Sequence, residues 1–248
     1  MNNDAYNYIA EDYDLKRKKP WRALEVFIKD FVKNNGNFKG TVLDLGCGNA
    51  RNFPLFKERN NRIIGIDKTL QFLKIAKNLL KNGALFDKRS NNSVQLINCD
   101  FLYLPLRKNS INFLISIASY HHVHTKIERY NLITTINDIL KPKGFILVSV
   151  WRKYQKGYKG HFLKDILKRK LFPSYKKQQT NLGLPEFGDI YISWTLSKEN
   201  KTYKRFYHFF SKFEIKHILS IFKIIVLRKF GGPNKKDNFF ILAQKKSE

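Results

Sequence analysis

The chain of 248 residues is 43% hydrophobic, which is enough for one sizeable core of the α/β kind. Its formal charge of +27 attracts polyanions such as nucleic acid, although the lysine-rich composition is by itself an alternative reason for the excess. The lack of long apolar runs, the polar N-terminus and the presence of only two cysteines exclude a membrane span, a secretory signal, a disulfide framework and a metal cluster, so we expect a cytoplasmic protein without a metal site.

Apolar runs rich in β-branched residues alternate with helical patterns between about residues 41 and 150. This alternation is typical of βαβ units, in which helices cover both faces of a parallel sheet. Strands are predicted at residues 41–45, 62–66, 94–98, 111–118 and 145–150. Apolar residues at helical spacing predict helices at residues 70–80 and 127–140, and the sequence Lys-Pro-Lys-Gly at 141–144 predicts a turn before the fifth strand.

The segment 152–203 departs from this rhythm, because it is basic and is interrupted by prolines and glycines. Residues 152–177 include ten lysines and arginines but only one acidic residue, Asp165. A helix is predicted near residues 211–222, followed by strands near 224–229 and 238–243 with a Gly-Gly-Pro turn between them. We therefore expect one domain over residues 1–248, with a basic, loop-rich insertion at about 152–203.

Glycines follow the first predicted strand in the sequence Asp-Leu-Gly-Cys-Gly at residues 44–48. Glycine at the end of a strand lets the backbone approach a ligand closely. The turn is not a dinucleotide fingerprint, because Arg51 stands where G-x-G-x-x-G requires its third glycine. An acid before such a turn suits a cofactor that has a cationic amino-acid end and no phosphate, and S-adenosylmethionine fits this description.

Two further acids stand at the ends of predicted strands. Asp67 ends the second strand, where a carboxylate can accept both ribose hydroxyls, and Asp100 follows the third, where class I methyltransferases place an acid on the adenine amine. Each acid alone is an ordinary strand-end residue, but all three together predict the cofactor, because ligands of open α/β sheets bind at the carboxyl ends of strands. The predicted cofactor-binding residues are Asp44, Gly46, Cys47, Gly48, Asp67, Lys68, Asp100, Phe101 and Ile117.

Motifs along nearly the whole chain appear in the order found in one enzyme family. They are the segments 5–6 (Ala-Tyr), 17–21 (Arg-Lys-Lys-Pro-Trp), 115–122 (Ile-Ser-Ile-Ala-Ser-Tyr-His-His), 150–151 (Val-Trp), 189–194 (Asp-Ile-Tyr-Ile-Ser-Trp), 205–210 (Arg-Phe-Tyr-His-Phe-Phe) and 237–238 (Asp-Asn). The chain thereby resembles the tRNA (uridine-34) 5-carboxymethyl methyltransferases, including the methyltransferase domain that some proteins fuse to an AlkB-type oxygenase. Ala50, Ser193 and Phe239 depart from the family's glycine, proline and tryptophan, and the last two leave room for a shifted acceptor.

The resemblance implies a Rossmann-like class I methyltransferase whose mostly parallel, seven-stranded sheet has the order 3-2-1-4-5-7-6 and helices on both faces. It also implies S-adenosylmethionine-dependent methylation of the carboxylate of 5-carboxymethyluridine, at wobble position 34 of tRNA, to the methyl ester. A carboxyl group with a pKa of about 4 is ionised at neutral pH and needs no general base, but its charge needs cationic or donor groups. The candidates to hold the carboxylate, the base or neighbouring phosphates are His122, Arg17, Arg205 and His208.

The resemblance implies two partners as well. The first is the anticodon loop of tRNA, whose single-stranded bases can be splayed out, and we expect the basic insertion to fold over this arm. The second is a small zinc-binding activator subunit that forms a heterodimer with family members. The third strand would serve it as an unpaired sheet edge, because its residues Val94, Leu96 and Ile97 are apolar and it carries no lysine.

Two other functions remain open. Methyltransferases of small molecules such as quinones and sterols share the cofactor motifs, but those motifs do not predict the segments 17–21 and 205–210. A catalytically silent RNA-binding subunit is the other alternative, and the intact acids and glycines of the predicted cofactor site argue against it. Methylation of total tRNA from a deletion strain would discriminate among the three functions.

Overall fold

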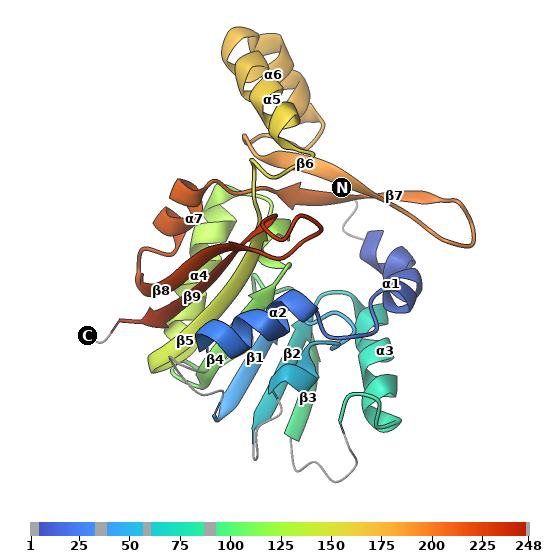
Figure 1. The fold of residues 1–248 in the computed structure, drawn as a ribbon, viewed down its shortest axis with the longest axis vertical. Coiled ribbons are helices and arrows are strands. Elements are labelled where there is room, and N and C mark those ends of the chain that lie inside the picture. Colours follow the sequence, from blue (N-terminus) through green and yellow to red (C-terminus); the bar gives the residue numbers. More distant parts are fainter. Residues whose placement is uncertain (1–4, 33–38, 57–60, 87–92, 247–248) are drawn as a thin grey trace.

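The computed structural model of the protein describes residues 5–32, 39–56, 61–86 and 93–246. Its main sheet has seven strands in the order β3-β2-β1-β4-β5-β9-β8 (Figure 1). Strands β1 to β5 are parallel, and β9 runs antiparallel to both β5 and β8, so the observed order is the predicted one. The strands are β1 (Thr41–Leu45), β2 (Arg62–Asp67), β3 (Ser93–Asn98), β4 (Ile111–Ile117), β5 (Leu140–Trp151), β8 (Phe222–Phe230) and β9 (Asn238–Lys245).

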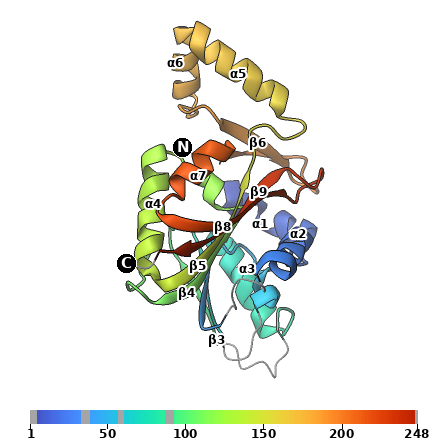
Figure 2. The ribbon, with the colours of Figure 1, turned by 60° about the vertical axis from the view of Figure 1, so that its left-hand side comes forward.

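Helices cover both faces of this sheet, because side chains along its strands alternate between two apolar clusters. In β4, Leu114 belongs to the cluster that also contains residues of α4 (Lys126–Ile139) and α7 (Lys212–Ile218). Its neighbours Phe113 and Ile115 belong to the cluster formed with α2 (Arg22–Phe27) and α3 (Leu70–Lys81). The turned view shows these two pairs of helices on opposite sides of the sheet (Figure 2). No helix in the described part of the chain is long and apolar enough to cross a membrane.

The N-terminal segment forms three helical pieces that the sequence analysis does not predict. They are α1 (Ala5–Lys16), α2 and the π-helical turn η1 (Ile28–Val32). The pattern of α1 is difficult to recognise, because its buried positions include Asp12 beside the apolar Ala5 and Ile9. This helix packs against α3 and against the strand β7 (Thr202–His208).

The insertion at 152–203 is not loop-rich, and this expectation was wrong. It contains α5 (Lys159–Leu171), α6 (Pro173–Asn181) and β6 (Asp189–Thr195), and β6 pairs with β7 in a separate antiparallel sheet. The β6–β7 hairpin lies beyond the carboxyl ends of the parallel strands, and the α5–α6 hairpin projects away from the body (Figure 1). Lysines and leucines share the exposed face of α5, so its sequence lacks the polar outer face by which an amphipathic helix is recognised.

The prediction of a separate turn at 141–144 was also wrong. Strand β5 begins at Leu140, which pairs with Ile111 of β4, and the register shifts before pairing resumes between Phe113 and Phe145. Lys143 has φ 62°, in the left-handed region, so these residues form an irregular first part of the strand rather than a separate turn.

Candidate functional site

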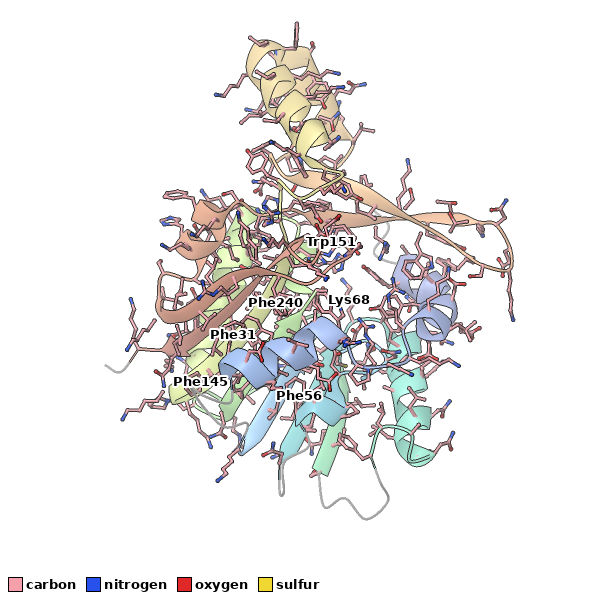
Figure 3. The ribbon with its side chains drawn as sticks, in the orientation of Figure 1. Phe31, Phe56, Lys68, Phe145, Trp151 and Phe240 are labelled. Carbon is pink, nitrogen blue, oxygen red and sulfur yellow. The ribbon has the colours of Figure 1, made fainter. Side chains whose placement is uncertain are left out.

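A cavity of about 1490 Å³ opens at the carboxyl edge of the sheet. Its walls come from the glycine turn after β1, the ends of β2 and β4, helix α1 and the β6–β7 hairpin. Lys68 and Trp151, at the carboxyl ends of β2 and β5, lie on this side of the sheet (Figure 3). Pockets for one small ligand are roughly 300–1,000 Å³, so this cavity has room for a cofactor together with an acceptor.

The turn after β1 requires glycine at position 46. The amide groups of Gly46 and Cys47 both donate to the carbonyl of Ile66, at 2.8 and 3.0 Å, and this holds the turn against the end of β2. Gly46 has φ 79°, and a Cβ atom there would lie 2.4 Å from the Ser119 Oγ. A side chain at Gly48 would meet no atom within 4 Å, because this residue lines the open cavity.

Asp67 is fixed at the wall of the cavity. Its Oδ2 accepts from the Gly48 amide and its Oδ1 from the Thr69 amide, both at 2.8 Å. Asp44 lies beneath the turn instead of on the wall, and its Oδ2 has no hydrogen-bond partner in the described part of the chain. Burial and the nearby charge of Asp67 raise the pKa of Asp44 to about 8. Two buried carboxyl groups at this point favour a cationic ligand.

The end of β3 supplies a third carboxylate. Asp100 forms an ion pair with Lys68, whose Nζ is 2.7 Å from Oδ2, and its Oδ1 accepts from the Leu102 amide at 3.1 Å. Phe101 and Ile117 line the same cavity. Eight of the nine predicted cofactor-binding residues therefore lie on one wall, and Asp44 lies directly behind it.

Arg205 marks the other end of the cavity. The residue is 8% exposed, its Nη1 donates to the Tyr207 hydroxyl at 2.8 Å, and its guanidinium lies 4.9 Å from the ring centre of Trp194. Its Nε has no hydrogen-bond partner among the described residues, although the residue lines the cavity. A buried cation with donor capacity left over is a binding site for an anionic group.

His122 also lines the cavity, but both of its ring nitrogens are already engaged. Its Nδ1 lies 2.7 Å from the Phe206 carbonyl, which can only accept, so Nδ1 carries the proton. Its Nε2 then accepts from the Tyr6 hydroxyl at 2.8 Å. Burial lowers the pKa of His122 to about 3, so the ring is neutral and positions Tyr6 against β7.

Comparisons with known proteins show that the chain is similar to methyltransferases. A family described as a methyltransferase domain matches residues 43–148. The tRNA (carboxymethyluridine(34)-5-O)-methyltransferase of Schizosaccharomyces pombe is 27% identical over 98% of this chain and 95% of its own length. The protein of the same name from Saccharomyces cerevisiae is 27% identical over 73% of this chain and 60% of its own. The mouse protein ALKBH8 is also 27% identical, over 65% of this chain but 22% of its own length.

Among solved structures, an S-adenosylmethionine-dependent methyltransferase from Methanosarcina mazei has the same fold. Its TM-score is 0.67 at 19% identity, over 88% of this chain and 98% of that one. A second, from Clostridium acetobutylicum, has a TM-score of 0.64 at 14% identity, over 98% of this chain and all of that one. The chain is a class I S-adenosylmethionine-dependent methyltransferase. The predicted fold class, cofactor and resemblance to the tRNA wobble-uridine enzymes are confirmed.

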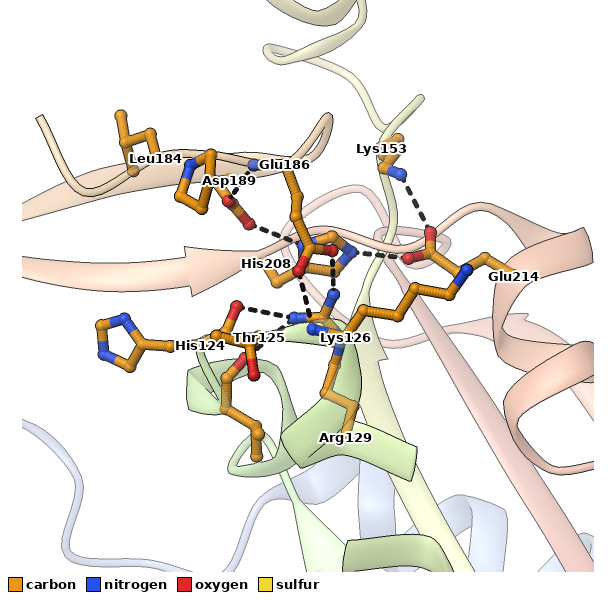
Figure 4. Close-up of polar contacts among 12 residues, drawn as sticks. His124, Thr125, Lys126, Arg129, Lys153, Leu184, Glu186, Asp189, His208 and Glu214 are labelled. Carbon is orange, nitrogen blue, oxygen red and sulfur yellow. Dashed lines mark hydrogen bonds and ion pairs between the residues drawn. The ribbon is translucent and has the colours of Figure 1, made fainter. Parts of the chain in front are cut away.

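His208 of this methyltransferase is not on the cavity wall, in contrast to the prediction. Its Nδ1 and Nε2 lie 2.7 Å from carboxylate oxygens of Asp189 and Glu214, and Lys153 Nζ lies 2.9 Å from the second oxygen of Glu214 (Figure 4). The imidazole thus bridges the two carboxylates. His208 therefore ties β7 to β6 and to the first turn of α7, contacts that its sequence position does not reveal.

The same network continues to α4 of the methyltransferase. The amide of Glu186 donates to Asp189 at 2.7 Å, and the carboxylate of Glu186 forms an ion pair with the fully buried Arg129 (Figure 4). Arg129 also donates to the carbonyls of Val123 and His124, at 3.0 and 2.9 Å. The β6–β7 hairpin is thus anchored to α4 and α7, two helices that pack on the main sheet.

Arg17 lies at the rim of the cavity and is exposed, with its guanidinium 5.9 Å from the ring centre of Trp194. Three of the four predicted acceptor-side residues, Arg17, His122 and Arg205, therefore converge, and His208 does not. Tyr6 and Trp194 complete this end of the cavity without having been assigned to it from sequence. Both residues lie in segments that resemble the family, and this resemblance is the sequence feature by which they could have been assigned to the site.

Proposed function

We propose that this methyltransferase converts 5-carboxymethyluridine, at wobble position 34 of tRNA, into its methyl ester. The observation that carries the proposal is Arg205, a buried cation with an unpartnered Nε on the acceptor side of the cavity. An acceptor with a carboxylate arm would satisfy this cation, whereas a neutral quinone or sterol would leave it unpaired. The names of the relatives from both yeasts support the same acceptor.

The residues of the cofactor wall fit S-adenosylmethionine. Asp67 would accept from the ribose hydroxyls, Asp100 and Phe101 would hold the adenine, and the turn at Gly46 and Gly48 leaves space for the methionine part. The orphaned Asp44 carboxyl behind the turn fits the positive charge of that part. When bound, S-adenosylmethionine supplies a methyl group on a positively charged sulfur, which an anionic oxygen can displace in line without a general base.

The protein's own task in this reaction is to orient the acceptor and exclude water. Arg205 would direct the acceptor carboxylate while the rings of Trp194 and Tyr207 shield that guanidinium from solvent. His122 and Tyr6 would close the wall between the two ligands through their hydrogen bond. No group needs to take up a proton, which agrees with the neutral, fully engaged state of His122.

The α5–α6 hairpin supports a tRNA substrate. Its only acid, Asp165, is buried and bonded to Arg169 at 2.8 Å. Six lysines on the hairpin are exposed and free to contact phosphates, namely Lys159, Lys164, Lys168, Lys170, Lys176 and Lys177. We infer that the anticodon arm lies along this hairpin with its loop at the cavity mouth, and a tRNA substrate also fits the predicted cytoplasmic location.

The function is tested by the modified nucleosides of tRNA. Purified protein with S-adenosylmethionine should transfer methyl label to total tRNA from a strain that lacks the gene. Mass spectrometry of the wobble nucleoside should show a mass increase of one methylene group relative to 5-carboxymethyluridine. Methylation at another nucleoside, or of quinones in place of tRNA, would contradict the proposal.

The pH dependence of turnover tests the absence of a base. His122 has a pKa of about 3 and the acceptor carboxylate one of about 4, so neither changes its charge between pH 6 and pH 8. With S-adenosylmethionine saturating, kcat on tRNA should therefore stay constant within about twofold over this range. A tenfold rise per pH unit that disappears in His122→Gln would instead indicate a histidine base and an acceptor other than a carboxylate.

The activator subunit is a further part of this proposal. Strand β3 lies at the edge of the sheet and pairs only with β2 in the described part of the chain. Ser93, Gln95 and Asn98 are exposed on it, which leaves an edge that another chain could extend. We infer that a small zinc-binding subunit covers this edge in a heterodimer. The alternative is that the preceding segment, residues 82–92, folds back over this edge, and residues 87–92 of that segment lie outside the described residues.

Expressed alone, the protein should be poorly soluble or weakly active, and coexpression with the zinc subunit should restore both properties. Leu96→Lys should break the heterodimer, measured by copurification. Leu96 also packs against the core, so its replacement could act by unfolding the protein. Gln95→Lys adds the same charge to β3 at an exposed position and should weaken copurification without that risk. A monomer that is fully active on tRNA without any added subunit would refute this assignment.

A further inference from the structure

Two buried amide side chains line the cavity where β5 and β9 meet. Gln155 is 5% exposed and Asn238 is 3% exposed, and both belong to the cavity wall. The Nε2 of Gln155 and the Oδ1 of Asn238 have no hydrogen-bond partner among the described residues. Buried polar groups are almost always paired, so two unpaired amides on one cavity indicate a ligand that pairs with them.

The backbone around these amides is held in place on every side. Asn238, at the start of β9, pairs in register with Trp151, at the end of β5. The Gln155 carbonyl accepts from the amides of Tyr158 and Lys159 at 3.2 and 3.1 Å. The turn before Asn238 is closed by Asp237, whose carboxylate accepts from the Asn234 amide at 2.8 Å. The two unpaired amides therefore belong to ordered structure and not to a loose loop.

Aromatic rings stand beside the two amides on the same wall. The Trp151 ring centre lies 5.0 Å from that of Tyr207 and 6.1 Å from that of Tyr158, and all three residues line the cavity. The Arg205 guanidinium lies 5.2 Å from the ring centre of Tyr207. The acceptor end thus combines flat apolar surfaces, a cation and two amides. This combination fits a planar heterocycle that has a polar edge and an anionic arm.

We propose that Gln155 and Asn238 bind the polar edge of the wobble uracil while Arg205 holds its carboxylate arm. Uracil presents a donor at N3 between two carbonyl acceptors, and single-stranded bases are read at this edge and stacked on aromatic rings. An amide supplies both an acceptor for N3–H and a donor for a neighbouring carbonyl, whichever way it is turned. The inference rests on the proposed function, and it identifies the residues that select the base as distinct from its side arm.

The test pairs changes in the protein with a change in the RNA. An anticodon stem-loop that carries 5-carboxymethyluridine is compared with one whose uracil is also methylated at N3, which removes the donor. With S-adenosylhomocysteine bound, the wild-type protein should bind the N3-methylated stem-loop roughly 10- to 100-fold more weakly. The double variant Asn238→Leu/Gln155→Met keeps the side-chain sizes and removes both amides, so it should bind the two RNAs alike, at the weaker level. Asn131→Leu, at an exposed position of α4 outside this cavity, is the matched control and should discriminate as the wild type does.

Calorimetry with S-adenosylmethionine and thermal melting show whether each variant is folded. If the double variant fails to fold, the single variants Asn238→Leu and Gln155→Met take its place, and the one that removes the acceptor for N3–H should lower discrimination in the same assay. Folded variants that still discriminate as strongly as the wild type would overturn the inference. Failure of the wild-type protein to methylate either stem-loop would sink the proposed function instead. The binding comparison would still decide whether these amides read a base.

Discussion

Asp67→Ala should abolish measurable binding of S-adenosylmethionine. The variant removes two acceptors for the ribose hydroxyls and also the anchor of the Gly48 amide, now 2.8 Å from Oδ2. Hydrogen bonds to a charged group contribute about 1.5–3 kcal/mol each, so the affinity should fall at least about 100-fold. The fold should remain, because burial raises the pKa of Asp67 and its charge is therefore not a source of stability in the free protein.

Isothermal calorimetry measures this affinity, and thermal melting checks the fold. Asp138→Ala is a matched control, because Asp138 is a half-exposed carboxylate that pairs only with Lys108 at 3.4 Å in the described part of the chain. This control should bind the cofactor as the wild type does. An unchanged affinity in Asp67→Ala would remove Asp67 from the cofactor site.

Arg205→Ala should lower kcat/KM on tRNA by about 100- to 1,000-fold while the affinity for S-adenosylmethionine stays within about twofold. The loss of an oriented cation beside the reacting carboxylate corresponds to about 2.7–4 kcal/mol of barrier. Arg205→Lys keeps the charge but not the planar donor geometry, so its turnover should lie between those of the wild type and the alanine variant. Arg17→Ala should have a smaller effect, because Arg17 is exposed at the rim.

Steady-state kinetics with tRNA and calorimetry with the cofactor separate these roles. Lys201→Ala, which removes an exposed cation outside the cavity from the β6–β7 connection, is the control and should change kcat/KM by less than about threefold. If Arg205→Ala lost cofactor binding and kept tRNA binding, the two ends of the cavity would be assigned the wrong way round.

The cofactor wall could be predicted from sequence because its residues are set by local rules. Asp67 and Asp100 each follow a recognisable buried strand, and parallel strands bring their carboxyl ends to one edge. The role of His208 could not be predicted in this way. Its partners Asp189 and Glu214 belong to β6 and to the first turn of α7, and only the folded hairpin brings them together.

The acceptor wall was only partly predictable for the same reason. The helical pattern of α1 is interrupted by Asp12, which is buried because its carboxylate accepts from the Trp194 indole at 2.7 Å and from the Ser197 amide at 2.9 Å. That contact, and with it the placement of Tyr6, depends on residues about 180 positions further along the chain. The prediction of a loop-rich insertion failed for a similar reason. Helix α5 packs through Phe162 and Asp165 and leaves its leucines exposed, so its sequence does not show the apolar face of an amphipathic helix.

The two ends of the cavity differ in how much of the chain each one needs. The cofactor wall is built from residues 44–119, whereas the acceptor wall brings Tyr6 together with Arg205 and Asn238. Closing a longer stretch of chain costs more entropy, and contacts distant in sequence form late in folding. We therefore expect a nascent chain to acquire its cofactor wall first and its acceptor wall only after β9 has been made. Tyr6, which is made before Arg205 and Asn238, would thus reach its final place only after both of them.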